Sequence, residues 1–593
     1  MTEAQETAAE AGLPPDIGPV PRPGSGIGRA AVLIGAITIV SNIVGFGRQL
    51  VFAHTVSATC LGTAYATANQ VPNIIYDVVL GGALTSVLIP VLAGPAARRL
   101  GQAPATGPAA ADGSVLDGSV PGGSVPAGSA TARDSAEGQA SQIASAMLSW
   151  VVLLLAPVSV IIAVAATPVA TLLLAGAPRC AHATIVAVSS RMLVVFAPQI
   201  LLYGLAVALY GILQAHRRFT APALAPVLSS VVVISAYLAF VPLSQGYGRL
   251  ATLPRSAELL LSVGTTAGVA ALALTALVPA LRLRLRLRPT LRFPAGVAPR
   301  IRGLAAVGLV ALIAQDASVV AVMVLANGQE GQGALVLYNF GWQMFFVPYA
   351  VLAVPIATTA FPLLAAAEGA RFDEMSAAST RAVMLVTWLG AALLAGAAVP
   401  ASRLFTHQPA DARQLAYTFA AFAPGLVGYG LSTHLSRVLF ADARTRVAAA
   451  ALVAGWLLVI VADVVTVALV PDWWVVPVLG LGNTIGLTVG GLALLGAVRR
   501  ARGRAALRGT ARAALAGLAG AVAGAVAGGA LSAAVPASGF IPNAGVTILA
   551  CGCVALVFGG AALAVDGGDL RALLARGRGM LPGFRVAGRK PPS

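Results

Sequence analysis

The chain has 593 residues, of which 58% are apolar and only 10% are charged. Soluble globular domains carry about 25% charged residues, so this composition excludes a soluble enzyme or binding domain of this size. The net charge is +17, yet Lys590 is the only lysine. A P-loop and an internal Schiff base both need a lysine, so the chain is expected to carry no ATPase motor and no Schiff-base lysine.

Fourteen apolar stretches are long enough to cross about 30 Å of hydrocarbon as helices, so the sequence predicts an all-α polytopic membrane protein. Residues 1–28 lack the basic start and apolar core of a signal peptide and are predicted to be a disordered tail. The predicted spans are 31–53, 64–92, 142–175, 183–213, 221–243, 256–281, 303–327, 334–365, 382–404, 413–440, 447–470, 474–498, 513–535 and 545–565.

The basic residues are distributed unevenly between alternate loops. If the N-terminus is cytoplasmic, the inner loops and tails hold 30 basic residues and the outer loops hold 5. Positively charged loops stay on the cytoplasmic side, so both termini are predicted to be cytoplasmic. The basic loops 282–302 and 499–512 and the basic tail 566–593 are then expected to meet anionic membrane lipids rather than nucleic acid.

An internal repeat divides the chain. The pattern Phe-Ala-Pro-x4-Tyr-Gly-Leu occurs at 196–205 and again at 422–431, an offset of 226. Pro90 and Pro362, in similar surroundings, are offset by 272. The difference of 46 is close to the length of 94–140, a Gly/Ser/Pro/Ala-rich segment predicted to be a disordered cytoplasmic linker. Two offsets that disagree by one visible insertion indicate a duplication.

The copies lie six spans apart, so they run in the same direction through the membrane. Parallel repeats of this kind form the two lobes of alternating-access transporters, with a site between them. We expect an N-lobe at 29–281, a C-lobe at 303–498 and two additional helices at 513–565. Prolines in the matched second, fourth, eighth and tenth spans favour bent helices that line a central cavity.

Several segments resemble the MurJ/MviN family of lipid II flippases, in the multidrug, oligosaccharidyl-lipid and polysaccharide exporter superfamily. They are Ser41-Asn-Ile-Val-Gly-Phe-Gly-Arg48, Val71-Pro-Asn73, 82–93, 214–226 and 338–355. The resemblance implies movement of the undecaprenyl-diphosphate-linked peptidoglycan precursor from the inner to the outer leaflet of the bacterial inner membrane. It also implies a V-shaped cavity, a lipid-tail groove at 513–565 and cell-wall synthesis proteins as partners.

Polar residues inside the spans are the candidate site residues, because a charge at the bilayer centre costs about 2.5–3.5 kcal/mol on insertion scales. Arg48 matches a family arginine and can hold a diphosphate through two hydrogen bonds, whereas Asn42 stands where the family has another arginine. Asp77 and Asp316 are predicted to couple an ion or to act in gating, and the depth of Asp316 also allows an ion pair with Arg191 between the lobes. The predicted substrate contacts are Arg48, Asn42, Asn73, Arg191 and Gln343.

Cys60 and Cys180 fall in the first two outer loops, where an oxidising compartment allows a disulfide. Cys551 and Cys553 are interpreted as packing residues of the last span. Asp463 lies in the eleventh span without an obvious partner. No cofactor is expected, and transport would be driven by the membrane potential or by a coupled ion.

Alternative functions remain open at this point. Most of the charged positions of the family's second and eighth spans are occupied here by uncharged residues, which leaves another polyprenyl-linked glycan as a possible cargo. An ion-coupled drug exporter of the same superfamily would need no tail groove. A membrane glycosyltransferase would need paired carboxylates in an aqueous loop, and the outer loops offer only isolated acids. A scaffold without transport activity is the remaining alternative.

Overall fold

The computed structural model describes residues 25–78, 128–177, 179–216, 218, 220–244, 250–283, 288–291, 297–329, 332–406 and 408–565. Every regular element in these ranges is a helix, which confirms the all-α class. Eleven helical segments among the described residues are long and apolar enough to cross a membrane, so the protein is a multi-pass membrane protein. The predicted spans 31–53, 64–92 and 413–440 are not among them, and the count of fourteen stays a prediction.

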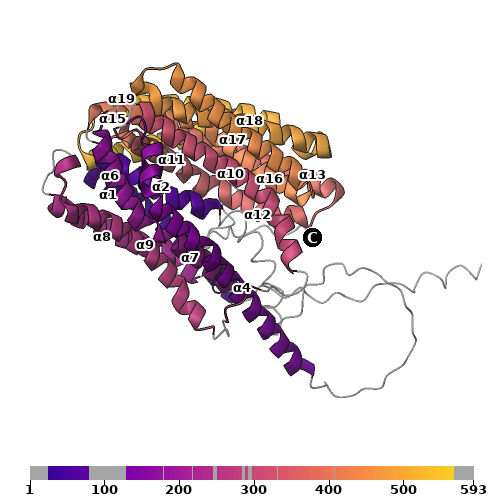
Figure 1. Cartoon of the computed structure of the whole chain (residues 1–593). Coiled ribbons are helices and arrows are strands. Elements are labelled where there is room, and N and C mark those ends of the chain that lie inside the picture. Colours follow the sequence, from indigo (N-terminus) through magenta and orange to yellow (C-terminus); the bar gives the residue numbers. More distant parts are fainter. Residues whose placement is uncertain are drawn as a thin grey trace, which may run out of the picture.

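The first lobe is built from one half of the repeat (Figure 1). Helix α8 packs along α9 and against α1, while α7 packs between α4 and α9. Its elements are α1 (Ser25–Thr55), α2 (Cys60–Val78), α4 (Gly128–Val164), α5 (Ala166–Leu173), α6 (His182–Phe196), α7 (Pro198–Ala215), α8 (Thr220–Ser244), a 3-10 turn (Leu250–Thr252) and α9 (Arg255–Leu281).

The second lobe lies beside the first in Figure 1 and repeats the order of its described elements, with a π-helical turn and α12 in addition. Helix α17 packs along α18, which also contacts α15 and α16. Its elements are α10 (Val297–Gln329), α11 (Ala334–Pro348), a π-helical turn (Tyr349–Ala353), α12 (Val354–Ala365), α13 (Gly369–Gly396), α14 (Ala398–Ser402), α15 (Pro409–Phe422), α16 (Gly425–Ala441), α17 (Thr445–Ala468), a 3-10 turn (Asp472–Trp474) and α18 (Val475–Arg502).

The two lobes share the same helix interruptions. The repeated Phe-Ala-Pro motif ends α6 and α15, and its phenylalanines, Phe196 and Phe422, are fully buried. Proline removes a backbone donor from a helix, so the same motif breaks the same helix in each lobe. A short helix follows a long one at α4–α5 and at α13–α14, and a 3-10 turn precedes both α9 and α18. These matched breaks support the duplication inferred from the sequence.

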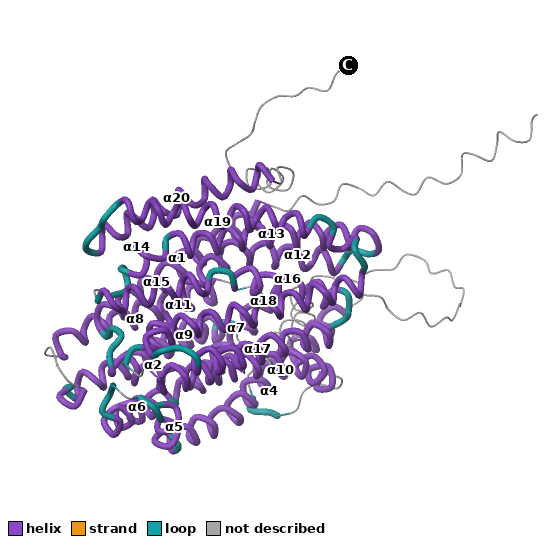
Figure 2. The backbone as a smooth tube through the Cα atoms, turned by 90° about the horizontal axis from the view of Figure 1, so that it is seen from above, coloured by secondary structure: helices purple, strands orange, loops and turns teal. Residues whose placement is uncertain are grey.

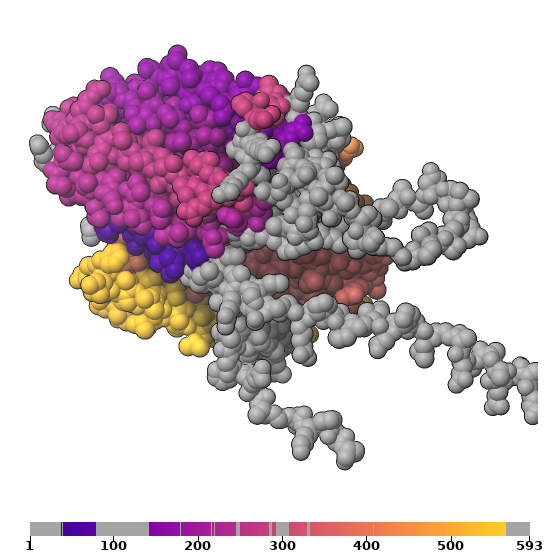
Figure 3. Space-filling view, turned by 90° about the horizontal axis from the view of Figure 1, so that it is seen from below, coloured from indigo at the N-terminus to yellow at the C-terminus, as the bar shows by residue number. Residues whose placement is uncertain are grey.

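Two more helices follow the second lobe, namely α19 (Thr510–Ala534) and α20 (Phe540–Val565). Helix α19 packs between α13 and α20, and Figure 2 shows the three helices side by side. Its glycines permit this close packing, because a β-carbon on Gly520 would lie 2.9 Å from the ring of Phe558. The C-terminal helices also approach α1 (Figure 3), where the rings of His54 and Phe540 are 5.7 Å apart.

The connection before α4 and the basic loops differ in part from the prediction. Helix α4 begins at Gly128, so the prediction of a disordered linker is wrong for 128–140, where Ala, Arg, Glu and Gln favour a helix. The rest of the predicted linker, 94–127, lies outside the described residues. So do residues 1–24 of the predicted N-terminal tail and the predicted C-terminal tail 566–593. In the loop 499–512, Arg502 pairs with Asp373 at 2.9 Å and Asp442 at 3.6 Å. This arginine therefore also holds α18 to its neighbours.

The lobes are joined at the end of the molecule where α1 leads into α2. Asn327 of α10 is fully buried and its Nδ2 donates to Thr67 Oγ1 and to the carbonyl of Leu173, both at 3.0 Å. The backbone N–H of Gly333 donates to Thr63 Oγ1 at 2.8 Å. We call these three hydrogen bonds the inter-lobe latch.

A close backbone contact lies beside this latch. A β-carbon on Gly176, after α5, would lie 2.5 Å from the Cα of Gly328 in α10. Real side chains do not approach a backbone so closely, so glycine at position 176 is required for the lobes to meet in this way.

Candidate functional site

A polar cavity of about 310 Å³ lies between the lobes, next to the latch. It is formed by α1, α2, α7, α8 and α9 of the first lobe and by α11 of the second. Its lining carries one cation, Arg48, together with six amide side chains and several aromatic rings. The amides are those of Gln49, Asn69, Gln70, Asn73, Asn339 and Gln343.

Arg48 is the positive charge of this cavity. It is half-buried, and no carboxylate among the described residues forms an ion pair with it. Its charge acts on the hydroxyls of Tyr65, Tyr203 and Tyr237, which surround it. A guanidinium held among neutral donors and acceptors keeps its full charge available for an anion, and it can form paired hydrogen bonds to phosphate oxygens.

A buried hydroxyl network supports this side of the cavity. Tyr65 Oη lies 2.8 Å from Tyr237 Oη and 2.7 Å from Thr265 Oγ1, so one residue links α2 to α8 and α9. The sequence analysis did not single out these residues. Buried aromatic hydroxyls usually find partners, but the sequence alone does not show which helices bring those partners together.

Aromatic rings close the cavity toward the latch. Phe52 follows Arg48 by one helical turn and is 6% exposed; its ring lies 6.3 Å from that of Phe340 in the second lobe. Phe340 packs at 4.9 Å on Phe405, which also contacts Phe46 at 5.9 Å. Rings from both lobes therefore separate the cavity from the nearby end of the molecule.

Three of the five predicted substrate contacts line the cavity, namely Arg48, Asn73 and Gln343. Asn42 lies nearly two turns before Arg48 on α1, is exposed and does not line the cavity. Asn69, which is not among the predicted contacts, also lines it, and its buried Oδ1 has no hydrogen-bond partner in the described part of the chain. An acceptor left free in this position suits a hydroxyl or amide donor of a ligand.

Arg191 does not pair with Asp316, and that expectation is wrong. Arg191 instead binds Glu258 of the same lobe, with Nε 2.8 Å from Oε1 and Nη2 2.6 Å from Oε2. Glu258 lies in the first turn of α9 and is 5% exposed. Glu258 is not among the site residues predicted from the sequence. Arg191 is also not among the residues that line the cavity.

This pair leads to a stability prediction. Arg191→Ala leaves the Glu258 carboxylate buried without its cation, and we expect the free energy of unfolding to fall by about 1–3 kcal/mol, less than for a fully buried pair because the arginine side chain is 38% exposed. Adding Glu258→Gln should recover part of the loss. Thermal unfolding of the purified protein checks this, with the exposed Arg255→Ala as control. Equal melting temperatures for the two arginine variants would contradict it.

The two predicted coupling carboxylates come from opposite lobes. Asp77 is half-buried near the end of α2, and Asp316 on α10 is 5% exposed, with no hydrogen-bond partner to its Oδ2 among the described residues. Two carboxylates repel when both are ionised, so a proton or cation shared between them would favour approach of the lobes. Asp463 on α17 is fully buried, and neither of its oxygens has a hydrogen-bond partner among the described residues.

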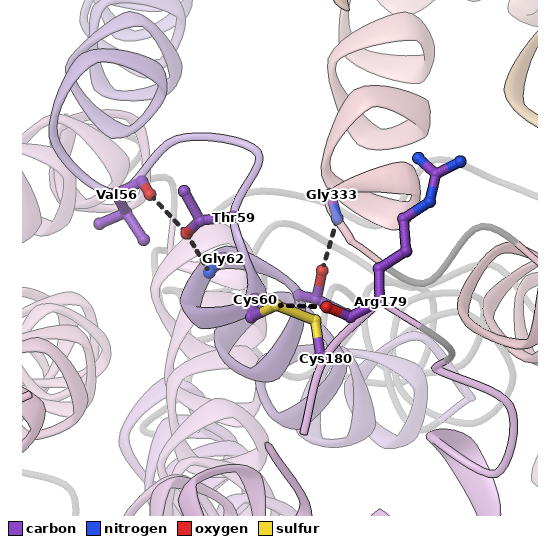
Figure 4. The surroundings of a disulfide bond; sticks show 8 residues. Val56, Thr59, Cys60, Gly62, Arg179, Cys180 and Gly333 are labelled. Carbon is purple, nitrogen blue, oxygen red and sulfur yellow. Dashed lines mark hydrogen bonds between the residues drawn. A yellow bond between two sulfur atoms is a disulfide. The ribbon is translucent and has the colours of Figure 1, made fainter. Parts of the chain in front are cut away.

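A disulfide joins Cys60, the first residue of α2, to Cys180, which precedes α6 (Figure 4). Their Cα atoms are 5.9 Å apart. Figure 4 shows this bridge next to Gly333 of the opposite lobe, whose N–H is part of the latch. Cys551 and Cys553 are free and half-buried.

The arrangement of helices in this chain is similar to that in several solved structures of transporters. A solved structure of lipid II flippase MurJ in an inward closed conformation has a TM-score of 0.66 at 17% identity and covers 92% of this chain and 100% of its own. An inward-facing multidrug resistance MATE family transporter of the MOP superfamily has a TM-score of 0.58 at 13% identity, over 79% of this chain and 98% of its own. A MOP superfamily transporter from Pyrococcus furiosus has a TM-score of 0.52 at 14% identity, over 81% and 96%.

These structural likenesses establish the fold. The sequence match is more specific, because the model of one family, described as lipid II flippase MurJ, matches residues 52–537, which is most of the chain. The chain therefore belongs to the lipid II flippase MurJ family.

Proposed function

We propose that this protein moves lipid II from the inner to the outer leaflet of the bacterial inner membrane. The single observation that carries this proposal is Arg48, which forms no ion pair with any described residue and lines a polar cavity between two lobes, in a chain of the MurJ family. A flippase has to hold a charged head group within the membrane, where an isolated charge is costly. The cavity supplies one cation and many neutral polar groups for that purpose.

Different residues of the cavity would bind different parts of the head group. Arg48 binds the diphosphate, while Asn69, Asn73 and Gln343 exchange hydrogen bonds with sugar and peptide groups. In the closed arrangement, Phe52 and Phe340 separate the bound head group from the end of the molecule that carries the latch. Transport then requires the latch to open while the opposite end closes, which is alternating access.

The lipid tail would remain outside the cavity, on the apolar surface of α19 and α20. These helices stand beside α13 and close to α1, and they expose large apolar side chains. Leu515, Val522, Ile548 and Leu556 are more than half exposed. Such side chains suit acyl or polyprenyl chains, so this pair of helices supports the tail groove that the family resemblance implies.

We also propose that the latch faces the outer side of the membrane and that both termini are cytoplasmic. The uneven distribution of basic residues supports this orientation, as does the disulfide, since disulfides persist in oxidising compartments. After reduction of intact cells, a membrane-impermeant maleimide should label Cys60 and Cys180. Labelling only after the membrane is permeabilised would overturn the orientation.

The energy source is proposed to act on the buried carboxylates, through a coupled ion or the membrane potential. Asp77 and Asp316 lie on opposite lobes and are both at least half-buried, so neutralising either one should weaken the dependence of transport on ion gradients. Comparing Asp77→Asn and Asp316→Asn in liposomes with imposed proton or sodium gradients checks this. An unchanged gradient dependence in both variants would remove these residues from coupling.

The decisive experiment for the function is depletion of this protein in growing cells. A lipid II-cleaving toxin that acts only from outside should then lose its substrate, while total lipid II rises. Re-expression of the wild-type chain should restore cleavage. Unchanged cleavage after depletion would count against lipid II as the cargo and would favour another polyprenyl-linked glycan.

A further inference from the structure

A second cavity, of about 570 Å³, lies in the second lobe and shares no lining residue with the central one. It is bounded by α14, α15 and the connection between α19 and α20. Because Phe540, which begins α20, contacts His54 at the end of α1, this cavity lies at the same end of the molecule as the latch. Neither the cargo path nor the family resemblance assigns it a role.

The cavity is positively charged. Arg403 and Arg413 both line it, and neither forms an ion pair with any described residue. The N-terminal ends of two long helices also border it, through Pro409 of α15 and Gly539 just before α20. Helix N-termini carry a partial positive charge and favour anions. Two arginine side chains and two helix N-termini, all positively charged, therefore border the same cavity.

A buried amide makes the site more selective than a simple anion pocket. Asn543 lines the cavity and is 3% exposed; its Nδ2 donates to the carbonyl of Gly539 at 2.7 Å. Its Oδ1 is buried and accepts no hydrogen bond from any residue that the structure describes. An amide oxygen can only accept, so a phosphate alone would leave it unsatisfied, whereas a ligand with a hydroxyl group would not.

Exposed apolar side chains either line this cavity, as Val399 and Tyr417 do, or directly follow its lining residue Gly539 in the sequence, as Phe540 and Ile541 do. Val399 is 45% exposed, Tyr417 43%, Phe540 41% and Ile541 82%. Exposed aromatic and aliphatic groups around a charged pocket suit a lipid, whose chains can lie on them, better than a free anion in water.

We infer that this cavity binds the phosphate of a lipid whose head group also carries a hydroxyl. Arg403 and Arg413 bind the phosphate oxygens, and Asn543 Oδ1 accepts a hydrogen bond from the hydroxyl. Two lipids share this chemistry, namely a resident phospholipid with a glycerol head group and the translocated glycosyl diphosphate. The second source rests on the proposed function, and the first does not.

Photo-crosslinking tests the site. The full chain in detergent is irradiated with photoactivatable phosphatidylglycerol, and the cross-linked peptides are identified by mass spectrometry. We expect cross-links within 399–417 and 537–543, and about a tenfold lower yield there for Arg403→Gln with Arg413→Gln, since charged hydrogen bonds contribute about 1.5 kcal/mol or more. Arg255→Gln, another exposed arginine predicted on the outer side, is the matched control. Yields that are unchanged in the double variant, or equally reduced in the control, would overturn the site.

The hydroxyl contact has its own test. Unlabelled phosphatidylglycerol should compete about tenfold better than phosphatidylmethanol, which keeps the phosphate but lacks the hydroxyl, because an unsatisfied buried acceptor costs about 1–3 kcal/mol. Asn543→Leu should remove this preference and leave the arginine effect in place. A preference that survives in Asn543→Leu would overturn the assignment of Oδ1.

Competition with lipid II distinguishes the two sources. Displacement of the probe by lipid II at lower concentrations than by phosphatidylglycerol identifies the translocated cargo as the occupant. Displacement by phosphatidylglycerol alone identifies a resident phospholipid. If depletion shows that the chain does not move lipid II while phosphatidylglycerol still cross-links here, the proposed function fails and this site stands.

Discussion

Arg48→Ala is expected to abolish lipid II translocation while leaving the protein folded. Arg48 is the only charged residue lining the central cavity and is half-buried without an ion-pair partner among the described residues, so its loss removes attraction for the diphosphate but breaks no salt bridge. Charged hydrogen bonds contribute about 1.5–3 kcal/mol each, so cargo affinity should fall by about one to two orders of magnitude or more. Toxin cleavage of outer-leaflet lipid II in depleted cells that express the variant measures the effect.

Two controls make this result specific. Arg48→Lys keeps the charge but loses the planar pair of donors, so it should restore cleavage only in part. Arg446→Ala removes an exposed arginine at the start of α17, away from the cavity, and should behave as wild type. Full activity of Arg48→Ala at normal expression would remove Arg48 from the cargo site.

Gly176→Val is expected to hold the latch end of the transporter open and to stop transport. A β-carbon at this position would lie 2.5 Å from the Cα of Gly328 in the other lobe, and that contact cannot be relieved by rotating a side chain. The clash should outweigh the three latch hydrogen bonds, which contribute about 0.5–1.5 kcal/mol each. The central cavity should then be accessible from the outer side.

Cysteine labelling measures this opening. Ala66 lines the cavity and is 9% exposed, so Ala66→Cys places a small thiol there. A membrane-impermeant maleimide added to cells should label it several-fold faster in the Gly176→Val background. The same chain without Ala66→Cys corrects for Cys551 and Cys553. Gly545→Val is the matched glycine control, because no atom lies within 4 Å of its β-carbon position. Equal labelling in both glycine variants would contradict the latch.

The parts of the site that could be predicted are those that local sequence determines. Arg48, Asn73 and Gln343 are polar residues on helices that the repeat and the family resemblance place around the cavity, and all three line it. Phe52 could have been added, because it stands four residues after Arg48 and so on the same face of α1. Similarly, the Phe-Ala-Pro motif marks the helix breaks of both lobes.

The remaining parts depend on how helices rotate about their axes, which depth along the membrane does not reveal. Arg191 and Asp316 have similar predicted depths, yet Arg191 faces Glu258 on α9 within its own lobe. Likewise, the hydroxyl network of Tyr65 joins residues more than 170 positions apart in the sequence. Such pairs follow from the packing of α6 and α8 against α9 and from the reach of the Tyr65 side chain to α8 and α9, and no periodicity in the sequence specifies these contacts.

The end of the molecule that carries the latch has a covalently stiffened part, at the disulfide, and a part held only by hydrogen bonds, at the latch. Cys60, Thr63 and Thr67 follow one face of α2 at helical spacing, so the residues that hold the opposite lobe are mounted on a helix that is covalently braced within its own lobe. Strain applied across the lobes will break hydrogen bonds before it deforms the brace. Those three bonds amount to about 1.5–4.5 kcal/mol, and one charge moved through 100 mV supplies about 2.3 kcal/mol. The movement of one or two charges through the membrane potential therefore supplies enough free energy to break the three latch hydrogen bonds in each transport cycle.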